Sequence, residues 1–156
     1  MTEFNSSSKS PLGFAIERPK VNSVVSGKLI LLIDHEASVR VILQVCLSRL
    51  GGWDVLSVSS LSQGLEVLML KEALLIRRPD AILLDMPMLA TDGLGVIQEF
   101  RNHPLIQPIP IVLITAKASW FSPQELKQMR IVGAIAKPFN PMKLPKQITD
   151  ILNWEL

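Results

Sequence analysis

Four polar side chains stand directly after short apolar runs, and they are the residues best placed to carry chemistry. They are Asp34 after residues 29–33, Asp85 after residues 81–84, Thr115 after residues 109–114 and Lys137 after residues 134–136. Taken singly, each has an ordinary structural explanation, because Asp and Thr often cap turns or helices and Lys is usually solvated. Taken together, two acids, a hydroxyl and an amine that each directly follow an apolar run indicate a functional site.

The apolar runs have the character of strands that are buried on both faces, as in a parallel sheet. Strands are expected at about 29–33, 53–58, 81–84, 109–114 and 134–136. Helical spacing of apolar residues predicts helices at about 36–50, 61–78, 93–101, from Ser122-Pro123 onward, and 144–154. This strict alternation predicts an α/β fold with a parallel sheet and right-handed crossovers. Ligands of such sheets bind outside the carboxyl ends of the strands, which is where the four polar residues fall.

Composition limits the remaining possibilities. The chain has 156 residues, 48% of them hydrophobic, which suits one packed domain, and its formal net charge is +2. No basic cluster is longer than Arg77-Arg78, so we expect no nucleic-acid partner. The single cysteine, Cys46, excludes an internal disulfide, and its helical spacing predicts a buried position.

Residues 1–27 are rich in Ser, Asn and Pro and show no periodicity, so we expect a flexible extension before a domain at 28–156. Residues 1–20 contain no apolar run long enough for a signal peptide or a membrane span. We therefore expect a cytoplasmic protein without a membrane partner.

From about residue 28 to 156 the chain resembles the receiver domains of two-component response regulators. Four segments carry the resemblance in the correct order: Leu31–Glu36, Pro79–Asp85 with Asp92-Gly93 following, Ile109–Lys117, and Ala136–Phe139. The resemblance implies a flavodoxin-like, doubly wound, five-stranded parallel sheet in the order 2-1-3-4-5, with helices on both faces. It also implies a cis peptide bond between Lys137 and Pro138.

The resemblance also assigns a role to each polar residue. Asp85 would be the phosphoacceptor, and Thr115 and Lys137 would bind the phosphoryl oxygens. Asp34, Asp85 and the backbone carbonyl of Pro87 would hold Mg²⁺. A phosphoryl group brings two or three negative charges, which a cation and a lysine would offset.

Three positions depart from the family pattern. His35 stands where the family usually has a second acid that ligates the metal, and imidazole suits transition metals better than Mg²⁺. Whether His35 is a metal ligand stays open, as does pairing of a protonated His35 with Asp85, and we do not assume that Glu36 replaces the acid. We expect weaker Mg²⁺ binding than in the His35→Asp variant. Ala134 replaces a frequent aromatic residue, and Leu89 replaces a proline.

Two functions remain in competition. The first is a single-domain response regulator in a phosphorelay, which accepts a phosphoryl group on Asp85 from a histidine kinase or phosphotransfer protein. Because the chain ends with the last predicted helix, its output would be a protein contact on the face formed by residues 122–154. The second is a pseudo-receiver that acts as a phosphorylation-independent interaction module, which His35 and Ala134 favour.

An enzyme is the least favoured class. A nucleotide-binding enzyme would need glycines in the loop after the first strand, and residues 34–38 contain none. A phosphatase with a nucleophilic aspartate would need an acid two residues after Asp85, where this chain has Pro87.

Overall fold

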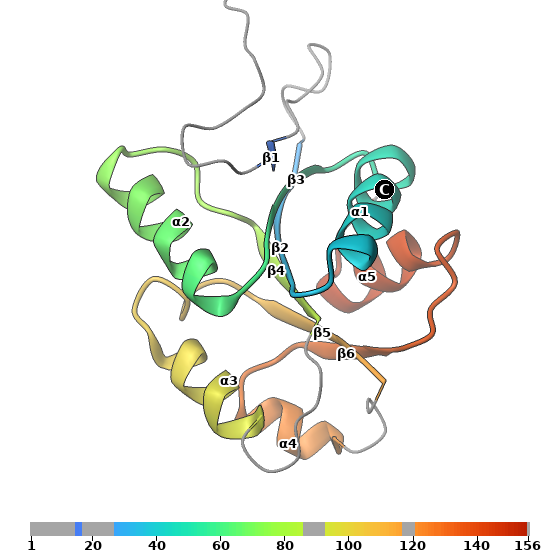
Figure 1. Ribbon diagram of the computed structural model, residues 1–156. Helices are drawn as coiled ribbons and strands as arrows, with labels where there is room; N and C mark the ends of the chain where they lie inside the picture. Colours follow the sequence, from blue (N-terminus) through green and yellow to red (C-terminus); the bar gives the residue numbers. More distant parts are fainter. Residues whose placement is uncertain (1–14, 17–26, 86–92, 117–120, 156) are drawn as a thin grey trace, which may run out of the picture.

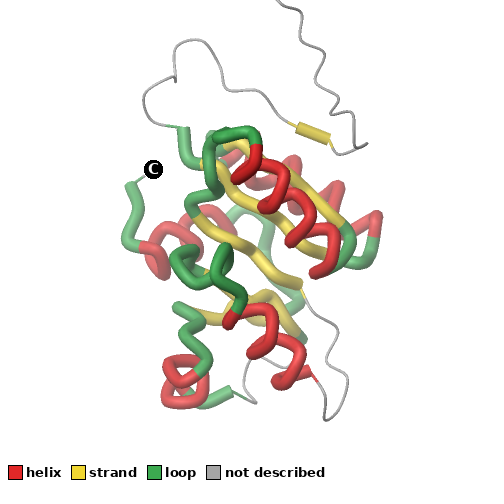
Figure 2. Tube along the Cα trace, turned by 90° about the vertical axis from the view of Figure 1, so that its left-hand side faces the viewer, coloured by secondary structure: helices red, strands yellow, loops and turns green. Residues whose placement is uncertain are grey.

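A single sheet with helices on both faces forms the domain (Figures 1 and 2). The structure, a computed structural model, describes residues 15–16, 27–85, 93–116 and 121–155. Its strands are β1 (Ala15–Ile16), β2 (Leu29–Asp34), β3 (Asp54–Val58), β4 (Ala81–Asp85), β5 (Ile111–Thr115) and β6 (Gly133–Ala136). They are ordered β1-β3-β2-β4-β5-β6, and β2 to β6 are all parallel. The five parallel strands thus have the predicted 2-1-3-4-5 order.

The helices divide between the two faces of the sheet. They are α1 (Ala37–Val45) with a π-helical turn η2 (Cys46–Leu50), α2 (Leu61–Ala73), α3 (Gly93–Asn102), α4 (Pro123–Gln128) and α5 (Leu144–Leu152). Figure 1 shows α1 and α5 on one side of the strands and α2, α3 and α4 on the other. This is the doubly wound arrangement that right-handed crossovers between parallel strands produce.

Alternation of side chains along the strands gives the domain two apolar cores. In β2, Leu31 and Ile33 pack toward α2 and α3, whereas Ile30 and Leu32 pack toward α1 and α5. Every residue of β2, β4 and β5 is buried, including the polar residue that ends each strand. The polar strand ends are therefore fixed by packing on both faces of the sheet.

A sixth strand lies at one edge of the sheet, and the sequence analysis did not predict it. Ala15 and Ile16 pair with Ser57 and Leu56 of β3 in antiparallel orientation. A two-residue strand within a polar segment leaves no periodic pattern to detect. Residues 1–14 and 17–26 lie outside the described residues, so the proposed flexible extension stays a prediction.

The predicted helix at 61–78 is too long, because α2 ends at Ala73, well before Pro79. Leu75 adopts a left-handed conformation with a φ of 56°. Its N–H donates to the carbonyl of Glu72 at 3.2 Å, and the N–H of Ile76 donates to the carbonyl of Lys71 at 2.8 Å. This pair of bonds is a Schellman termination, which normally has glycine at the left-handed position. Because leucine takes the place of the usual glycine, the sequence does not indicate that the helix ends here.

The predicted helix at 36–50 changes its winding at Cys46. The N–H of Gly51 donates to the carbonyl of Cys46 at 3.2 Å, a π-type bond five residues apart. Cys46 is buried, as its spacing predicted, and its thiol donates to the carbonyl of Pro141 at 2.9 Å. At the other end of the chain, α5 stops at Leu152 rather than at residue 154, because Asn153 is left-handed.

Replacing Leu75 by glycine should stabilise the protein. The left-handed conformation costs an L-residue roughly 1–2 kcal/mol, and the greater freedom of glycine in the unfolded chain offsets part of the gain. The Leu75 side chain is 91% exposed, so little packing is lost. We expect a net gain of about 1 kcal/mol in the free energy of unfolding, measured by urea denaturation. Leu75→Ala keeps the Cβ atom and should show no gain; equal stability of the two variants would contradict a left-handed Leu75.

Candidate functional site

The parallel strands bring the predicted polar residues to one edge of the sheet. Asp34 ends β2 and Asp85 ends β4, and the two residues are partners in the strand register. Thr115 ends the next strand, β5, where it is buried. The backbone N–H of Lys137 donates to the carbonyl of Thr115 at 3.0 Å, which continues the pairing beyond the end of β6. Neighbouring strand ends therefore carry the four polar residues that the sequence predicted as a site.

Lys137 and Asp85 form an ion pair at this edge. The Lys137 Nζ lies 2.6 Å from Asp85 Oδ2, and the two side chains are 24% and 1% exposed. A charge-assisted contact of this length between a buried carboxylate and a partly exposed ammonium is strong. The peptide bond between Lys137 and Pro138 is cis, as the resemblance predicted.

Asp34 is fully buried beside this ion pair. Its Oδ1 accepts the backbone N–H of Glu36 at 2.9 Å. Burial raises the pKa of Asp34 to about 6; the hydrogen bond from Glu36 opposes this shift, the nearby Asp85 adds to it and Lys137 lowers it. Arg40 Nη1 donates to the backbone carbonyl of Asp34 at 2.8 Å, so it fixes the loop without neutralising the carboxylate. Arg40 could not be predicted as part of the site, because a single arginine in a helix carries no distinctive sequence signal.

Three buried carboxylate oxygens accept no hydrogen bond from any residue that the structure describes: Asp34 Oδ2, Asp85 Oδ1 and Asp85 Oδ2. Asp85 Oδ2 is in the ion pair with Lys137, so Asp34 Oδ2 and Asp85 Oδ1 have neither a donor nor an ion-pair partner within the described residues. Buried polar atoms are nearly always satisfied, and adjacent unsatisfied carboxylate oxygens suit a hard divalent cation. The described residues contain no ready-made group of three or more acidic, histidine or cysteine ligands, so the fit to Mg²⁺ is partial. Pro87 and Leu89 lie outside the described residues, so the predicted carbonyl ligand stays a prediction.

His35 lies at the exposed side of the group formed by Asp34, Asp85 and Lys137, which we call the cation pocket. Its Nδ1 is 3.7 Å from Asp34 Oδ1, and its side chain is 52% exposed. Within the described contacts it approaches Asp34 and not Asp85, so the alternative pairing with Asp85 is not the arrangement found. Glu36 directs its backbone N–H at Asp34 while the residue itself is exposed. The acid missing at position 35 is therefore not replaced by the side chain of Glu36 in this conformation.

Ala134 lies in β6, half-buried against the core on the side of α4. Its small side chain borders an open groove of about 860 Å³ between α4, β6 and α5, which Phe121, Leu126 and Ile151 also line. Lys127 and Arg130 add positive charge at the rim of this groove. The groove belongs to the face at 122–154 on which the sequence analysis expected a partner.

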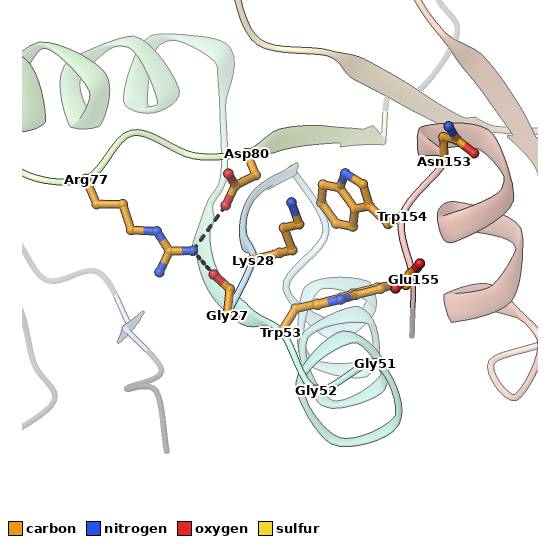
Figure 3. A pocket seen from close by; sticks show the side chains of 10 residues that line it. All are labelled: Gly27, Lys28, Gly51, Gly52, Trp53, Arg77, Asp80, Asn153, Trp154 and Glu155. Atoms are coloured by element: carbon orange, nitrogen blue, oxygen red, sulfur yellow. Dashed lines mark hydrogen bonds and ion pairs between the residues drawn. The ribbon is translucent and has the colours of Figure 1, made fainter. Parts of the chain in front are cut away.

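A polar hollow of about 860 Å³ lies at the amino ends of the strands, opposite the site (Figure 3). There Arg77 donates to the carbonyl of Gly27 and pairs with Asp80 at 3.1 Å. Lys28 lies over the ring of Trp154, 5.2 Å from its centroid, and Trp154 meets Trp53 edge to face. These groups contact one another and hold the segment after α5 against the sheet. Their contacts stabilise the fold, so the hollow is not a candidate site.

Comparison with known proteins agrees with this geometry. The model of the response regulator receiver domain matches residues 30–149. The chain therefore belongs to the receiver domain family of two-component signalling, in which phosphorylation of an aspartate is a general feature. Members of this family are signalling modules, not typically enzymes. None of the helices in the described ranges is long and apolar enough to cross a bilayer.

Among curated relatives, the phosphate regulon regulator PhoB of Pseudomonas aeruginosa is 29% identical over 81% of this chain and 52% of its own length. The probable transcriptional regulator ycf27 of Cyanidium caldarium is 34% identical over 79% of this chain and 45% of its own length. The chain thus spans about half the length of the curated relatives it matches.

Solved structures show the same fold. A putative response regulator of Chloroflexus aurantiacus has a TM-score of 0.63 at 25% identity, covering 82% of this chain and 99% of its own. Chemotaxis regulator CheY4 of Vibrio cholerae has a TM-score of 0.62 at 24% identity, covering 81% and 99%. The receiver of sensor histidine kinase PA1611 of Pseudomonas aeruginosa, with a TM-score of 0.62 at 24% identity over 82% and 99%, has a magnesium ion coordinated in its active site cleft.

The contribution of Asp34 to the stability of the metal-free protein should fall as the pH rises from about 4 to about 6. The ordinary pKa of Asp34 is 3.8 and its pKa in the folded chain is about 6. The protonated form is therefore favoured by folding; this contribution is full below the unfolded pKa and disappears as the pH rises through the folded pKa. A shift of about two units corresponds to about 3 kcal/mol.

Asp34→Asn removes this titration. In urea unfolding with EDTA it should be more stable than the native chain by up to about 3 kcal/mol near pH 7, and close to it near pH 4. Asp150→Asn, a matched change of charge at an exposed position in α5, should follow the native pH dependence. If the difference in the free energy of unfolding between the native chain and Asp34→Asn stayed constant from pH 4 to 7, the raised pKa of Asp34 would be contradicted.

Proposed function

We propose that this protein is a phosphorylatable receiver in which Asp85 accepts a phosphoryl group from a histidine kinase or a histidine phosphotransfer protein. The observation that carries the proposal is the arrangement around Asp85. One of its oxygens is held by Lys137 at 2.6 Å, and the other is buried without a donor among the described residues. A carboxylate with one oxygen anchored and one available is suited to act as a nucleophile.

In the proposed step, the available oxygen of Asp85 attacks the phosphorus atom of the donor. A P–O bond to Asp85 forms as the P–N bond to the donor histidine breaks, and the histidine leaves with the electron pair. Lys137 offsets the charge on the transferred group, and the hydroxyl of Thr115 would hydrogen-bond a phosphoryl oxygen. The reaction then depends on positioning and charge compensation, as is general for phosphoryl transfer.

Mg²⁺ is the cation expected for this chemistry, and Asp34 and Asp85 would hold it together with the backbone carbonyl of Pro87. When bound, the ion would neutralise part of the negative charge of the carboxylates and of the transferred phosphoryl group. Asp34 supports this role because its Oδ2 is buried and lacks a donor within the described part of the chain. The pKa of Asp34 is raised because its ionised form is poorly stabilised in the metal-free protein. A divalent cation would stabilise that ionised carboxylate.

The output surface is proposed to be the face formed by residues 122–154. Two features support it: the groove beside Ala134, and the exposed Val132, which is 50% accessible. An apolar groove rimmed by Lys127 and Arg130 suits a protein partner rather than a small molecule. We propose that the chain signals as a cytoplasmic regulator by binding such a partner.

A pseudo-receiver is the second candidate, and the surroundings of His35 and Ala134 favour it. His35 supplies no carboxylate to the cation pocket, and Ala134 cannot report the state of the site by a change of ring rotamer. The intact ion pair between Asp85 and Lys137 favours the phosphorylatable reading, because a binding module has no need for a buried nucleophile.

Treatment of the full chain with acetyl phosphate and Mg²⁺ should add one phosphoryl group to Asp85, detected by mass spectrometry and located by fragmentation. Omitting Mg²⁺, or replacing Lys137 by alanine, should reduce the yield by tenfold or more, because each removes positive charge from the transition state; a loss of about 1.4 kcal/mol is tenfold.

Asp85→Asn should accept no phosphoryl group, and Asp150→Asn should behave as the native chain. Absence of phosphorylation in the native chain with Mg²⁺, Mn²⁺ and Co²⁺ alike would overturn this proposal in favour of the pseudo-receiver. Equal labelling of Asp85→Asn would place the phosphoacceptor elsewhere.

A further inference from the structure

We propose that the cation pocket of this chain prefers a later first-row transition metal, of the class of Co²⁺, Ni²⁺ and Zn²⁺, over Mg²⁺, with His35 as its nitrogen ligand. The inference deepens the proposed function, since it concerns the metal of the same site. It concerns binding alone, so it can be tested without any phosphoryl donor.

The oxygen part of the proposed ligand set consists of Asp34 and Asp85. The side chain of Asp34 is fully buried and that of Asp85 is 1% exposed, and each has one oxygen without a donor from the described residues. Because the two residues are register partners on adjacent strands, their side chains leave the sheet at the same edge. Lys137 is bound to Asp85 Oδ2 and leaves Oδ1 available for a cation.

His35 is the donor that distinguishes this pocket. It follows Asp34 directly and lies in the loop between the end of β2 and the start of α1, so it belongs to neither element. Its Nδ1 already lies 3.7 Å from Asp34 Oδ1. With half of its side chain exposed, the imidazole can turn about its side-chain torsions toward a cation bound by the carboxylates without disturbing the core.

The chemistry of the donors sets the preference. Mg²⁺ is a hard cation that takes oxygen ligands, so it gains little from an imidazole. Co²⁺, Ni²⁺ and Zn²⁺ accept imidazole and carboxylate together, and their affinities for such sites follow the Irving–Williams order. The three donors are not assembled in the metal-free protein. With the imidazole of His35 turned toward the two carboxylates, two oxygens and one nitrogen would form a mixed set that favours these ions.

The chain provides its own control, because it contains only one other histidine, His103. The Nδ1 of His103 accepts the backbone N–H of Leu105 at 3.1 Å in the turn after α3, away from the strand ends that hold the acids. Substitution of His103 removes an imidazole without touching the pocket.

The test is isothermal titration of the full chain with Mg²⁺ and with Co²⁺, for the native protein, His35→Gln, His35→Asp and His103→Gln. We expect Co²⁺ affinity to fall about tenfold or more in His35→Gln while Mg²⁺ affinity stays within about twofold. In His35→Asp, the ratio of the Mg²⁺ to the Co²⁺ dissociation constant should fall by about tenfold or more, because the added carboxylate favours Mg²⁺. His103→Gln should match the native chain.

A spectroscopic readout reports the ligand directly. With Co²⁺ bound, proton NMR should show a strongly shifted exchangeable imidazole resonance in the native chain and in His103→Gln, and none in His35→Gln. Unchanged Co²⁺ affinity and an unchanged shifted resonance in His35→Gln would overturn the inference. Because these experiments contain no phosphodonor, a failure here leaves the phosphorylation of Asp85 to be judged by its own test.

Discussion

The two in-register carboxylates at the carboxyl edge of the sheet set the electrostatics of this protein. Adjacent strands lie about 4.8 Å apart, so two ionised side chains in register repel by about 3–4 kcal/mol at an effective dielectric near 20. Asp34 and Asp85 are both buried, and Lys137 is the ammonium group that the structure pairs with them, through Asp85. The pocket therefore holds excess negative charge, which protonation or a cation must balance.

The rest of the fold maintains this strained arrangement. Each acid is the last residue of a strand that is buried along its whole length, so neither can move out toward water without disturbing a core. The backbone N–H of Glu36 and the guanidinium of Arg40 fix the loop that carries Asp34. This arrangement lowers the stability of the metal-free protein, and the proposed binding of a divalent cation and a phosphoryl group would offset its negative charge.

The parallel sheet and the polar residues at its strand ends could be predicted from the sequence. Strands that are buried on both faces consist of continuous apolar residues, such as Leu29–Ile33. The polar residue after each run then marks the functional edge. Contacts decided by a few atoms were not predictable. Leu75, two residues after the end of α2, adopts a conformation usually taken by glycine, and β1 pairs through only two residues. Likewise, no pattern in the sequence indicated that His35 would lie beside Asp34 rather than Asp85, because the side chains of a loop follow from packing.

Two buried carboxylates share one lysine, so the titration of Asp34 measures how strongly they are coupled. Carbon-13 NMR of the aspartate carboxyl groups in the metal-free native chain should give a pKa of about 6 for Asp34. In Asp85→Asn this pKa should fall toward the ordinary value of 3.8, stopping above it because burial remains. A pKa near 4 for Asp34 in the native chain, unchanged by Asp85→Asn, would show that the two carboxylates are not coupled.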